Sequence, residues 1–177
     1  NIYLILTYVF FTFLIFDFFV PIYTSEKSDY YTSSNIDYDV NKHYGYHPKV
    51  SSEFTDRIYF KENLIKTNNY TINEFGHRIV PYFDEKKDKC IVFNGGSFIF
   101  GQSLSDKETL PYFVSLNLKT EASVYNYAFN GYGPHQFLSK LENKEIKELT
   151  HCKSLILIYM FIPDHVGRVA GRRSVSY

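Results

Sequence analysis

The sequence predicts an α/β fold in which helices cover both faces of a parallel sheet, a three-layer α/β/α arrangement. Three short apolar runs predict buried strands at residues 90–93, 123–128 and 154–161. Between them lie two segments with apolar residues at helical spacing, 112–118 and 134–149. Strands that are apolar on both faces and alternate with helices are typical of a parallel sheet with helices on each side.

Length and composition fit one such domain and exclude several classes of protein. The chain has 177 residues, and domains usually run about 100–200 residues. The formal net charge is zero, which excludes a basic stripe for nucleic acid as the organising feature. Hydrophobic residues make up 45% of the chain, which argues against a disordered protein. The first residue is Asn1 rather than methionine, and we expect the natural protein to be longer at both ends.

An apolar run precedes the predicted domain. Residues 1–20 are almost entirely apolar and aromatic, with Asp17 as the only charge, and about 20 such residues span the core of a bilayer. A cleaved signal peptide and a buried core helix are the alternatives, but no small-residue cleavage pattern follows the run. We therefore expect a transmembrane anchor at residues 1–23. Lys and Arg are sparse after it until Lys42, so the positive-inside rule places the rest of the chain in the periplasm or outside the cell.

Between the anchor and the α/β domain, the sequence predicts a tether and a small β-rich lead-in. Residues 24–44 are rich in Ser, Thr, Tyr and Asp without a helical period, which indicates a polar tether. Residues 45–88 contain two short runs of β-forming residues, at 57–60 and 70–73. Asparagines between these runs favour turns, so we expect a small antiparallel hairpin beside the main domain. The α/β domain then occupies residues 89–177.

Local signals support each element of this domain. The first strand ends in Asn94-Gly95-Gly96, which predicts a tight turn. Ser105 and Glu108 have the spacing of a capping box. Pro111 suits the first turn of the helix that follows, and Pro134 suits the start of the next one.

Small and polar residues gather where the three predicted strands end, at 94–97, 128–131 and 162–165. In parallel sheets ligands bind beyond the carboxyl ends of the strands, so we expect a site at this edge. Ser97 is the main candidate, because Gly95 and Gly96 allow a tight turn and close approach of a substrate to backbone amides. An anion-binding turn is the alternative, whereas neither the Walker A nor the dinucleotide fingerprint matches.

Two longer strings resemble sequence blocks of the SGNH (GDSL-type) hydrolases. Residues 91–110, IVFNGGSFIFGQSLSDKETL, are similar to the first block, in which a strand leads into G-D-S-F-T-x-G. Residues 125–133, YNYAFNGYG, are similar to the second block, a strand entering a loop of the type N-x-G-x-x-G. Residues 71–78 resemble a segment found upstream in membrane-anchored members. The resemblance covers about 45–168 and implies a flavodoxin-like parallel sheet, incomplete at the C-terminus of this chain.

The resemblance implies a serine esterase or acyl hydrolase that needs no cofactor and no metal. Ser97 matches the nucleophile, and the backbone N–H groups of Ser97 and Gly131 match donors of the oxyanion hole. Asn94, Gly96 and Asn130 would line the site. The expected substrate is an ester- or acyl-bearing small molecule or glycan outside the cytoplasm, with no nucleic acid as partner. An O-acyltransferase acting on a cell-surface polysaccharide is the alternative activity, because a sugar hydroxyl could replace water.

The chain departs from the family pattern at three places. Gly96 stands where the family has aspartate, and residues 162–165, Ile-Pro-Asp-His, stand where its G-x-N-D block is expected. The Asp-x-x-His that supplies the catalytic base is not found before Tyr177. A serine without a base is a poor nucleophile at neutral pH. Either the chain is a fragment of a longer enzyme, or the protein is a non-catalytic module that binds a glycan or a partner.

The remaining polar residues give weaker signals. Asp164 and His165 form either a site pair or a helix cap, and His135 lies at a predicted helix start with a surface role or a place in the site. The other candidates for metal ligands lack the spacing of a metal site: His43, His47 and His77. Cys90 and Cys152 each precede a predicted strand, and we expect buried thiols. An oxidising compartment would permit their pairing if the Cα atoms come within about 7 Å. The basic residues from Arg168 onward indicate a solvated helix.

Overall fold

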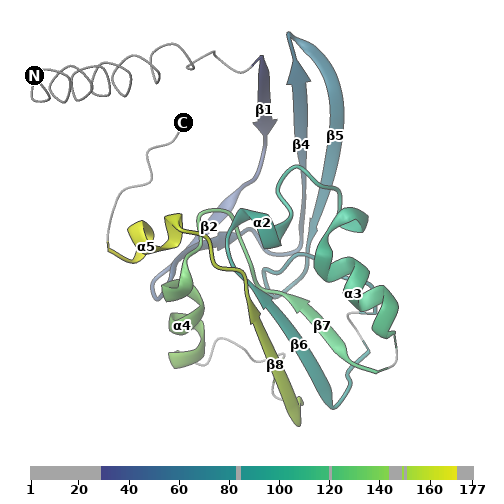
Figure 1. Cartoon of the computed structure of the whole chain (residues 1–177), viewed down its shortest axis with the longest axis vertical. Coiled ribbons are helices and arrows are strands. Elements are labelled where there is room, and N and C mark those ends of the chain that lie inside the picture. Colours follow the sequence, from purple (N-terminus) through teal and green to yellow (C-terminus); the bar gives the residue numbers. More distant parts are fainter. Residues whose placement is uncertain (1–28, 83–84, 120, 144–148, 150, 171–177) are drawn as a thin grey trace, which may run out of the picture.

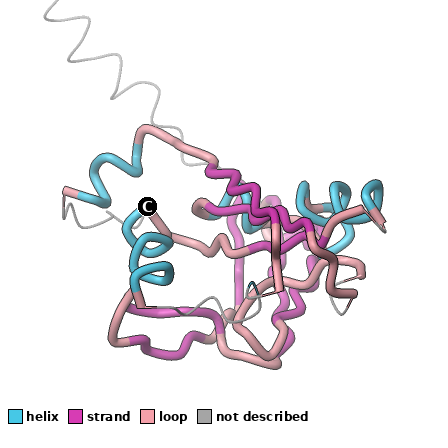
Figure 2. The backbone as a smooth tube through the Cα atoms, turned by 90° about the horizontal axis from the view of Figure 1, so that it is seen from below, coloured by secondary structure: helices cyan, strands magenta, loops and turns pink. Residues whose placement is uncertain are grey.

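A computed structural model of the chain describes residues 29–82, 85–119, 121–143, 149 and 151–170. Eight strands and four α-helices are found in this part of the chain (Figure 1). The elements are, in order, β1 Tyr30–Ser34, β2 Tyr38–Asn41, β3 Gly45–Pro48, β4 Ser52–Phe60, β5 Asn63–Ile72, β6 Lys89–Asn94, α2 Ser97–Phe100, the 3₁₀ turn η1 Asp106–Glu108, α3 Leu110–Leu118, β7 Ser123–Asn126, α4 Pro134–Glu142, β8 Ser154–Tyr159 and α5 Asp164–Val169. Seen from below, helices flank the strands on two sides (Figure 2).

The first half of the described chain forms an antiparallel sheet with the order β1-β4-β5. Strands β4 and β5 make a long hairpin whose turn, Lys61–Glu62, has positive φ angles of 45° and 69°, as the twist of a tight hairpin favours. Strand β1 pairs with the end of β4 next to this turn, so that Tyr30 lies opposite Phe60. These two rings are 4.7 Å apart, a cross-strand aromatic contact that helps to fix the register.

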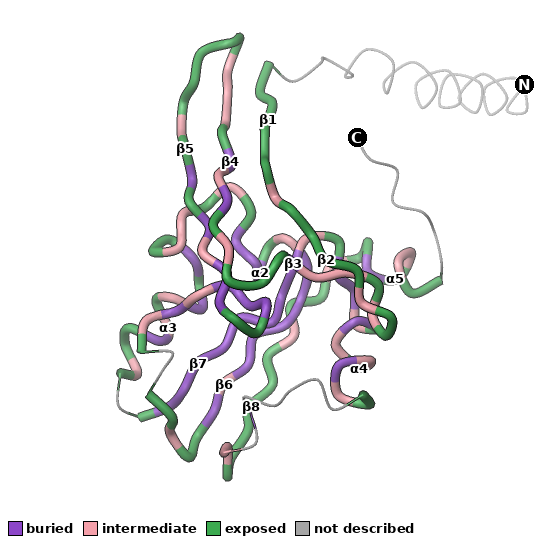
Figure 3. The backbone as a smooth tube through the Cα atoms, turned by 180° about the vertical axis from the view of Figure 1, so that it is seen from behind, coloured by how far each residue is buried: buried purple, intermediate pink, exposed green. Residues whose placement is uncertain are grey.

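The second half forms a parallel sheet with the order β7-β6-β8. The chain passes from the central strand β6 through α3 to β7, and then through α4 to β8 on the other side of β6. In parallel sheets whose strand order reverses in this way, ligands bind beyond the carboxyl ends of the strands. A separate two-stranded sheet, β2-β3, lies across the molecule between the two halves (Figures 1 and 3).

Arg78 joins the two larger sheets. Its backbone forms isolated bridges to Ile72, at the end of β5, and to Asn126, at the end of β7. The two halves then share one apolar core, in which Phe54 and Tyr70 of the antiparallel sheet pack with Phe93 and Phe100 beside β6. The β4–β5 hairpin therefore packs against the strand and the helix that carry the candidate site.

The prediction of a three-layer α/β/α flavodoxin-like parallel sheet is wrong for the described residues. Most of their strands are antiparallel, in β1-β4-β5 and β2-β3, and the parallel sheet has three strands. The predicted tether contains β1 and β2, and the expected small hairpin has strands of nine and ten residues. Tyrosine, threonine and isoleucine favour strands. These polar stretches form a three-stranded sheet because β4 pairs with both β1 and β5.

The three parallel strands and the helix between the first two lie where the sequence predicts them, but their burial differs. Strand β7 is buried along its whole length and β6 along most of it, whereas β8 is largely exposed (Figure 3). Helix α4 ends at Glu142 rather than at residue 149, and 144–148 lie outside the described residues. The predicted transmembrane run at 1–23 also lies outside them. Among the described residues, no helix has the length and apolar character needed to cross a membrane.

Candidate functional site

Ser97 is the first residue of α2, directly after the turn that ends the central parallel strand. Gly95 in this turn has a φ of +148°, and a Cβ atom there would lie 3.2 Å from the carbonyl oxygen of Met160. Glycine is therefore required where the chain leaves β6. The backbone carbonyl of Ser97 accepts hydrogen bonds from the N–H groups of Gly101 and Gln102, each 2.9 Å long. These bonds fix the position of the serine at the strand end.

Ser97 lines a pocket of about 220 Å³. Phe98, Gln102 and Ser103 complete its lining. The Phe98 side chain is 70% exposed, so an apolar surface stands at the pocket beside the hydroxyl group. A serine at a strand end beside an open, partly apolar pocket has the access that a nucleophile needs. Among the described residues, however, the Ser97 hydroxyl makes no hydrogen bond to a histidine or a carboxylate.

Arg78 holds the loop that follows Ser97. Its guanidinium group, which is fully buried, donates to the carbonyl oxygens of Phe100 at 2.8 Å and Gly101 at 2.7 Å, and also to that of Leu104. Its Nε donates to the carboxylate of Asp106 at 2.9 Å. Burial lowers the pKa of Arg78, and the hydrogen bond that Arg78 donates to Asp106 opposes this effect. One cation thus satisfies several carbonyls that would otherwise be buried without a donor.

A second buried network supports the other wall of the pocket. The Tyr70 hydroxyl donates to Asp56 at 2.9 Å and accepts from the backbone N–H of Ser103 at 2.7 Å. The Ser103 hydroxyl also donates to Asp56, at 3.1 Å. Burial, followed by the effect of Asp56, raises the pKa of Tyr70 above its ordinary value. The network links β4 and β5 to a residue that lines the pocket, so the hairpin positions part of the site.

On its other side, the turn before Ser97 lies against the start of α5. A Cβ atom on Gly96 would be 2.9 Å from Nη1 of Arg168 and 3.3 Å from Nε2 of His165. Arg168 donates to the backbone carbonyl of Tyr132 at 2.8 Å and pairs with Asp164 at 2.7 Å. Arg168, His165 and the backbone carbonyl of Tyr132 therefore leave little room for a side chain at position 96.

His165 has a defined tautomer in this arrangement. Its Nδ1 lies 2.7 Å from the Tyr159 hydroxyl and 3.4 Å from the backbone N–H of Ile162. An N–H group can only donate, so Nδ1 is the acceptor and the neutral ring carries its proton on Nε2. Burial and then Arg168 lower the pKa of His165, which favours this neutral form. Nε2 is buried without a hydrogen-bond partner among the described residues, so it presents a donor to the Gly96 turn, not a base.

Gly131, the predicted second oxyanion donor, lies under Tyr46 of β3. It has a φ of +77°, and a Cβ atom at this position would collide with the Tyr46 hydroxyl. That hydroxyl donates to the carbonyl of Asn130 at 2.7 Å. The side-chain oxygen of Asn130 and the side-chain nitrogen of Asn94 are buried without partners among the described residues.

The structure thus divides the predicted site residues into two groups. Ser97 lines the open pocket, and none of the other candidates does. Gly96, His165 and, through Arg168, Asp164 meet on the other side of the turn. His135 is exposed near the start of α4. The sequence reasoning missed Arg78 and the role of Arg168. The one sequence signal for Arg78 was its position at the end of residues 71–78, the segment that resembles one found upstream in membrane-anchored SGNH hydrolases.

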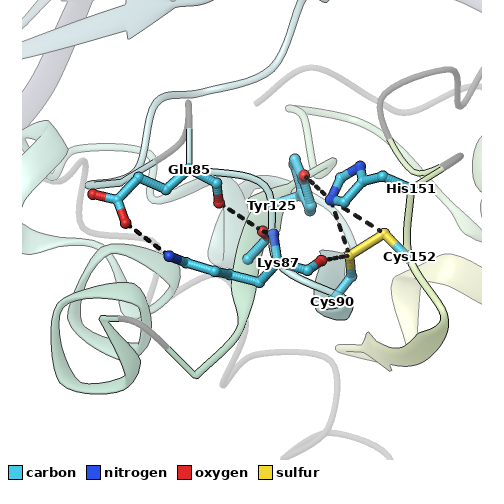
Figure 4. The surroundings of a disulfide bond; sticks show 7 residues. Glu85, Lys87, Cys90, Tyr125, His151 and Cys152 are labelled. Atoms are coloured by element: carbon cyan, nitrogen blue, oxygen red, sulfur yellow. Dashed lines mark hydrogen bonds and ion pairs between the residues drawn. A yellow bond between two sulfur atoms is a disulfide. The ribbon is translucent and has the colours of Figure 1, made fainter.

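Cys90 and Cys152 form a disulfide, with their Cα atoms 5.7 Å apart (Figure 4). The expectation of buried free thiols is therefore wrong. The bond joins the start of β6 to the loop before β8, at the opposite ends of these strands from Ser97. The pairing arises because the parallel register of β6 and β8 brings residue 90 opposite residue 155, close to the end of the preceding loop.

Comparison with protein-family models, with curated proteins and with solved structures finds no match for this chain. The functional assignment therefore depends on the residues and the geometry described above.

Proposed function

We propose that this protein is a serine-dependent ester hydrolase of the SGNH type, anchored in a membrane and acting outside the cytoplasm. The position of Ser97 carries the proposal. It lies on a glycine turn at the carboxyl end of the central parallel strand and lines an open pocket of about 220 Å³. Parallel sheets bind their ligands beyond the carboxyl ends of the strands.

In the proposed reaction, Oγ of Ser97 attacks the carbonyl carbon of an ester, and the alcohol leaves as the acyl-enzyme forms. Water then hydrolyses the acyl-enzyme. The backbone N–H of Ser97 is the proposed donor to the oxyanion, and preorganised donors of this kind contribute strongly to catalysis. Gly131, the second donor that the sequence suggested, lies under Tyr46 and does not line the pocket. The proposal requires a base for Ser97 from outside the described residues, since His165 presents its proton-bearing nitrogen to the turn.

The disulfide supports the proposed location. Disulfides persist in oxidising compartments such as the periplasm and the cell exterior and are rare in the cytosol. The apolar run at residues 1–20 would place the domain on that side of the membrane, because Lys and Arg are sparse in the flank that follows it.

A glycan- or partner-binding module is the second candidate, favoured by the lack of a hydrogen-bonded base at Ser97 among the described residues. An assay of ester hydrolysis by the complete protein, with short-chain nitrophenyl esters as substrates, distinguishes the hydrolase from the binding module. Ser97→Ala should lower kcat by about a thousandfold or more. Ser103→Ala, which alters the same pocket without removing the nucleophile, should keep most of the activity. Equal activity of Ser97→Ala and the wild type would refute the hydrolase.

A further inference from the structure

A third side chain lies against the disulfide. Nε2 of His151 is 3.6 Å from Sγ of Cys90 and 3.8 Å from Sγ of Cys152 (Figure 4). The three donor atoms lie within 4.8 Å of one another. We propose that reduction of the disulfide converts this cluster into a binding site for a zinc ion, with Cys90, His151 and Cys152 as ligands.

The distances from the imidazole to the two sulfurs fit tetrahedral zinc. Zinc binds thiolate sulfur at about 2.3 Å and imidazole nitrogen at about 2.0–2.1 Å, so a bound sulfur and nitrogen lie about 3.5 Å apart. The observed separations of 3.6 and 3.8 Å are close to this value. His151 therefore needs little movement, and the change required is the separation of the two sulfurs once their bond is broken.

The donor set also selects the metal. Two thiolates and one imidazole are the ligands that zinc prefers, whereas calcium and magnesium require oxygen. Three protein ligands leave the fourth position for water, and the Tyr125 hydroxyl, 3.4 Å from Nε2 of His151, stands beside it.

The surroundings hold the ligands in place and leave access for the metal. Cys90 is fully buried in the central strand β6, while His151 and Cys152 are half-buried. The backbone N–H of Cys152 donates to the carbonyl of Leu149 at 3.0 Å, which fixes the turn that carries both loop ligands. One ligand thus comes from a rigid strand, and two come from a turn that a reductant or a metal ion can reach.

The disulfide and the zinc site exclude each other, because zinc binds cysteine as the thiolate, and the sulfurs of a disulfide carry no negative charge. A dithiol reductant would transfer two electrons and two protons to the bond, giving two thiols while the reductant forms its own disulfide. Zinc would then replace the two thiol protons, which are released to solvent. The cluster would therefore hold metal only under reducing conditions.

The test uses the full chain in two redox states, so that the oxidised protein is a control of identical sequence. Zinc binding is measured by competition with a chromogenic chelator, without oxygen, after a phosphine reductant has been added and removed. We expect one zinc per reduced chain and none per oxidised chain. Cobalt in place of zinc should give the thiolate-to-cobalt charge-transfer absorption. Reduced protein that remains folded but binds no zinc would overturn the proposal.

Variants separate the proposed site from chance binding. His151→Ala should weaken zinc binding at least tenfold, and Cys152→Ser should abolish it. His135→Ala removes an exposed histidine elsewhere and should leave binding unchanged. Equal binding by His151→Ala and the wild type would contradict the assignment. If the reduced chain unfolds, its circular dichroism should return to the folded spectrum on zinc addition, and failure to do so would also overturn the proposal. Ser97→Ala should bind zinc normally, so the result is independent of the hydrolase assay.

Discussion

Replacement of Arg78 by methionine should destabilise the protein by about 3–5 kcal/mol, the range for removing one partner of a buried charged network. Methionine keeps much of the side-chain volume but none of the donors. The carbonyl oxygens of Phe100, Gly101 and Leu104 would lose their bonds to the guanidinium, and Asp106 would lose its ion pair. Hydrogen bonds to charged groups contribute about 1.5–3 kcal/mol each. The loss of stability should be smaller than the sum of these hydrogen-bond contributions, because relaxation of the loop lets water reach some of the carbonyl oxygens.

The free energy of unfolding is measured by urea denaturation followed by circular dichroism, since the chain has no tryptophan. Arg57→Met is the matched control, because Arg57 is exposed on β4 and its loss should change stability by no more than about 0.5 kcal/mol. Arg78→Lys keeps the charge but lacks the planar guanidinium group, so its free energy of unfolding should lie between those of the wild type and Arg78→Met. A cost below about 1 kcal/mol for Arg78→Met would show that the guanidinium does not hold the loop after Ser97.

Three further predictions follow from individual contacts. Gly96→Ala should cost about 1–3 kcal/mol in urea unfolding, because its Cβ would lie 3.2 Å from the backbone carbonyl oxygen of Tyr132 as well as against Arg168; an unchanged midpoint would contradict the close approach. Burial raises the pKa of Tyr70 in the folded protein. The stability that the neutral Tyr70 hydroxyl contributes is therefore present below pH 10 and is lost as the pH rises through the pKa of the folded state. Stability should therefore fall above pH 10, more steeply in the wild type than in Tyr70→Phe, and equal slopes would refute the shift. Reduction of the disulfide, which joins residues 62 apart, should lower stability by about 4 kcal/mol without zinc, and unfolding curves that coincide with and without reductant would exclude the bond.

The parallel part of the fold could be predicted because its signals are local. Each of the three strands is a compact apolar run, and Pro111 and the Ser105–Glu108 capping box mark the start of α3, the helix that leads to β7. In the structure the box caps the 3₁₀ turn η1, and the Thr109 side chain caps α3 itself.

The antiparallel part was predicted only as a small hairpin within residues 45–88, because its other strands carry no local signal. Strand β1 is exposed along its whole length and carries no alternating apolar pattern. It is ordered by pairing with β4, more than twenty residues away, and local sequence does not encode such pairing. The exposure of β8 was missed for a related reason, since an apolar run does not reveal whether any neighbour covers it.

The site was predicted in part. Gly96 and Ser97 were found because a glycine turn after an apolar strand is a local pattern. Arg78 and Arg168 were not, because charged residues are expected at the surface and become buried only where partners from distant segments meet them. The disulfide required the register of β6 and β8, which spacing alone does not give.

Labelling of the complete protein with a fluorophosphonate probe tests the central claim most directly, since the probe reacts with activated serines. Ser97→Ala and Ser103→Ala provide the comparison within one pocket. The account predicts labelling of the wild type and of Ser103→Ala, loss of labelling in Ser97→Ala, and a modified peptide that contains Ser97. No labelling of folded wild-type protein, or equal labelling of Ser97→Ala, would contradict the assignment of Ser97 as a nucleophile.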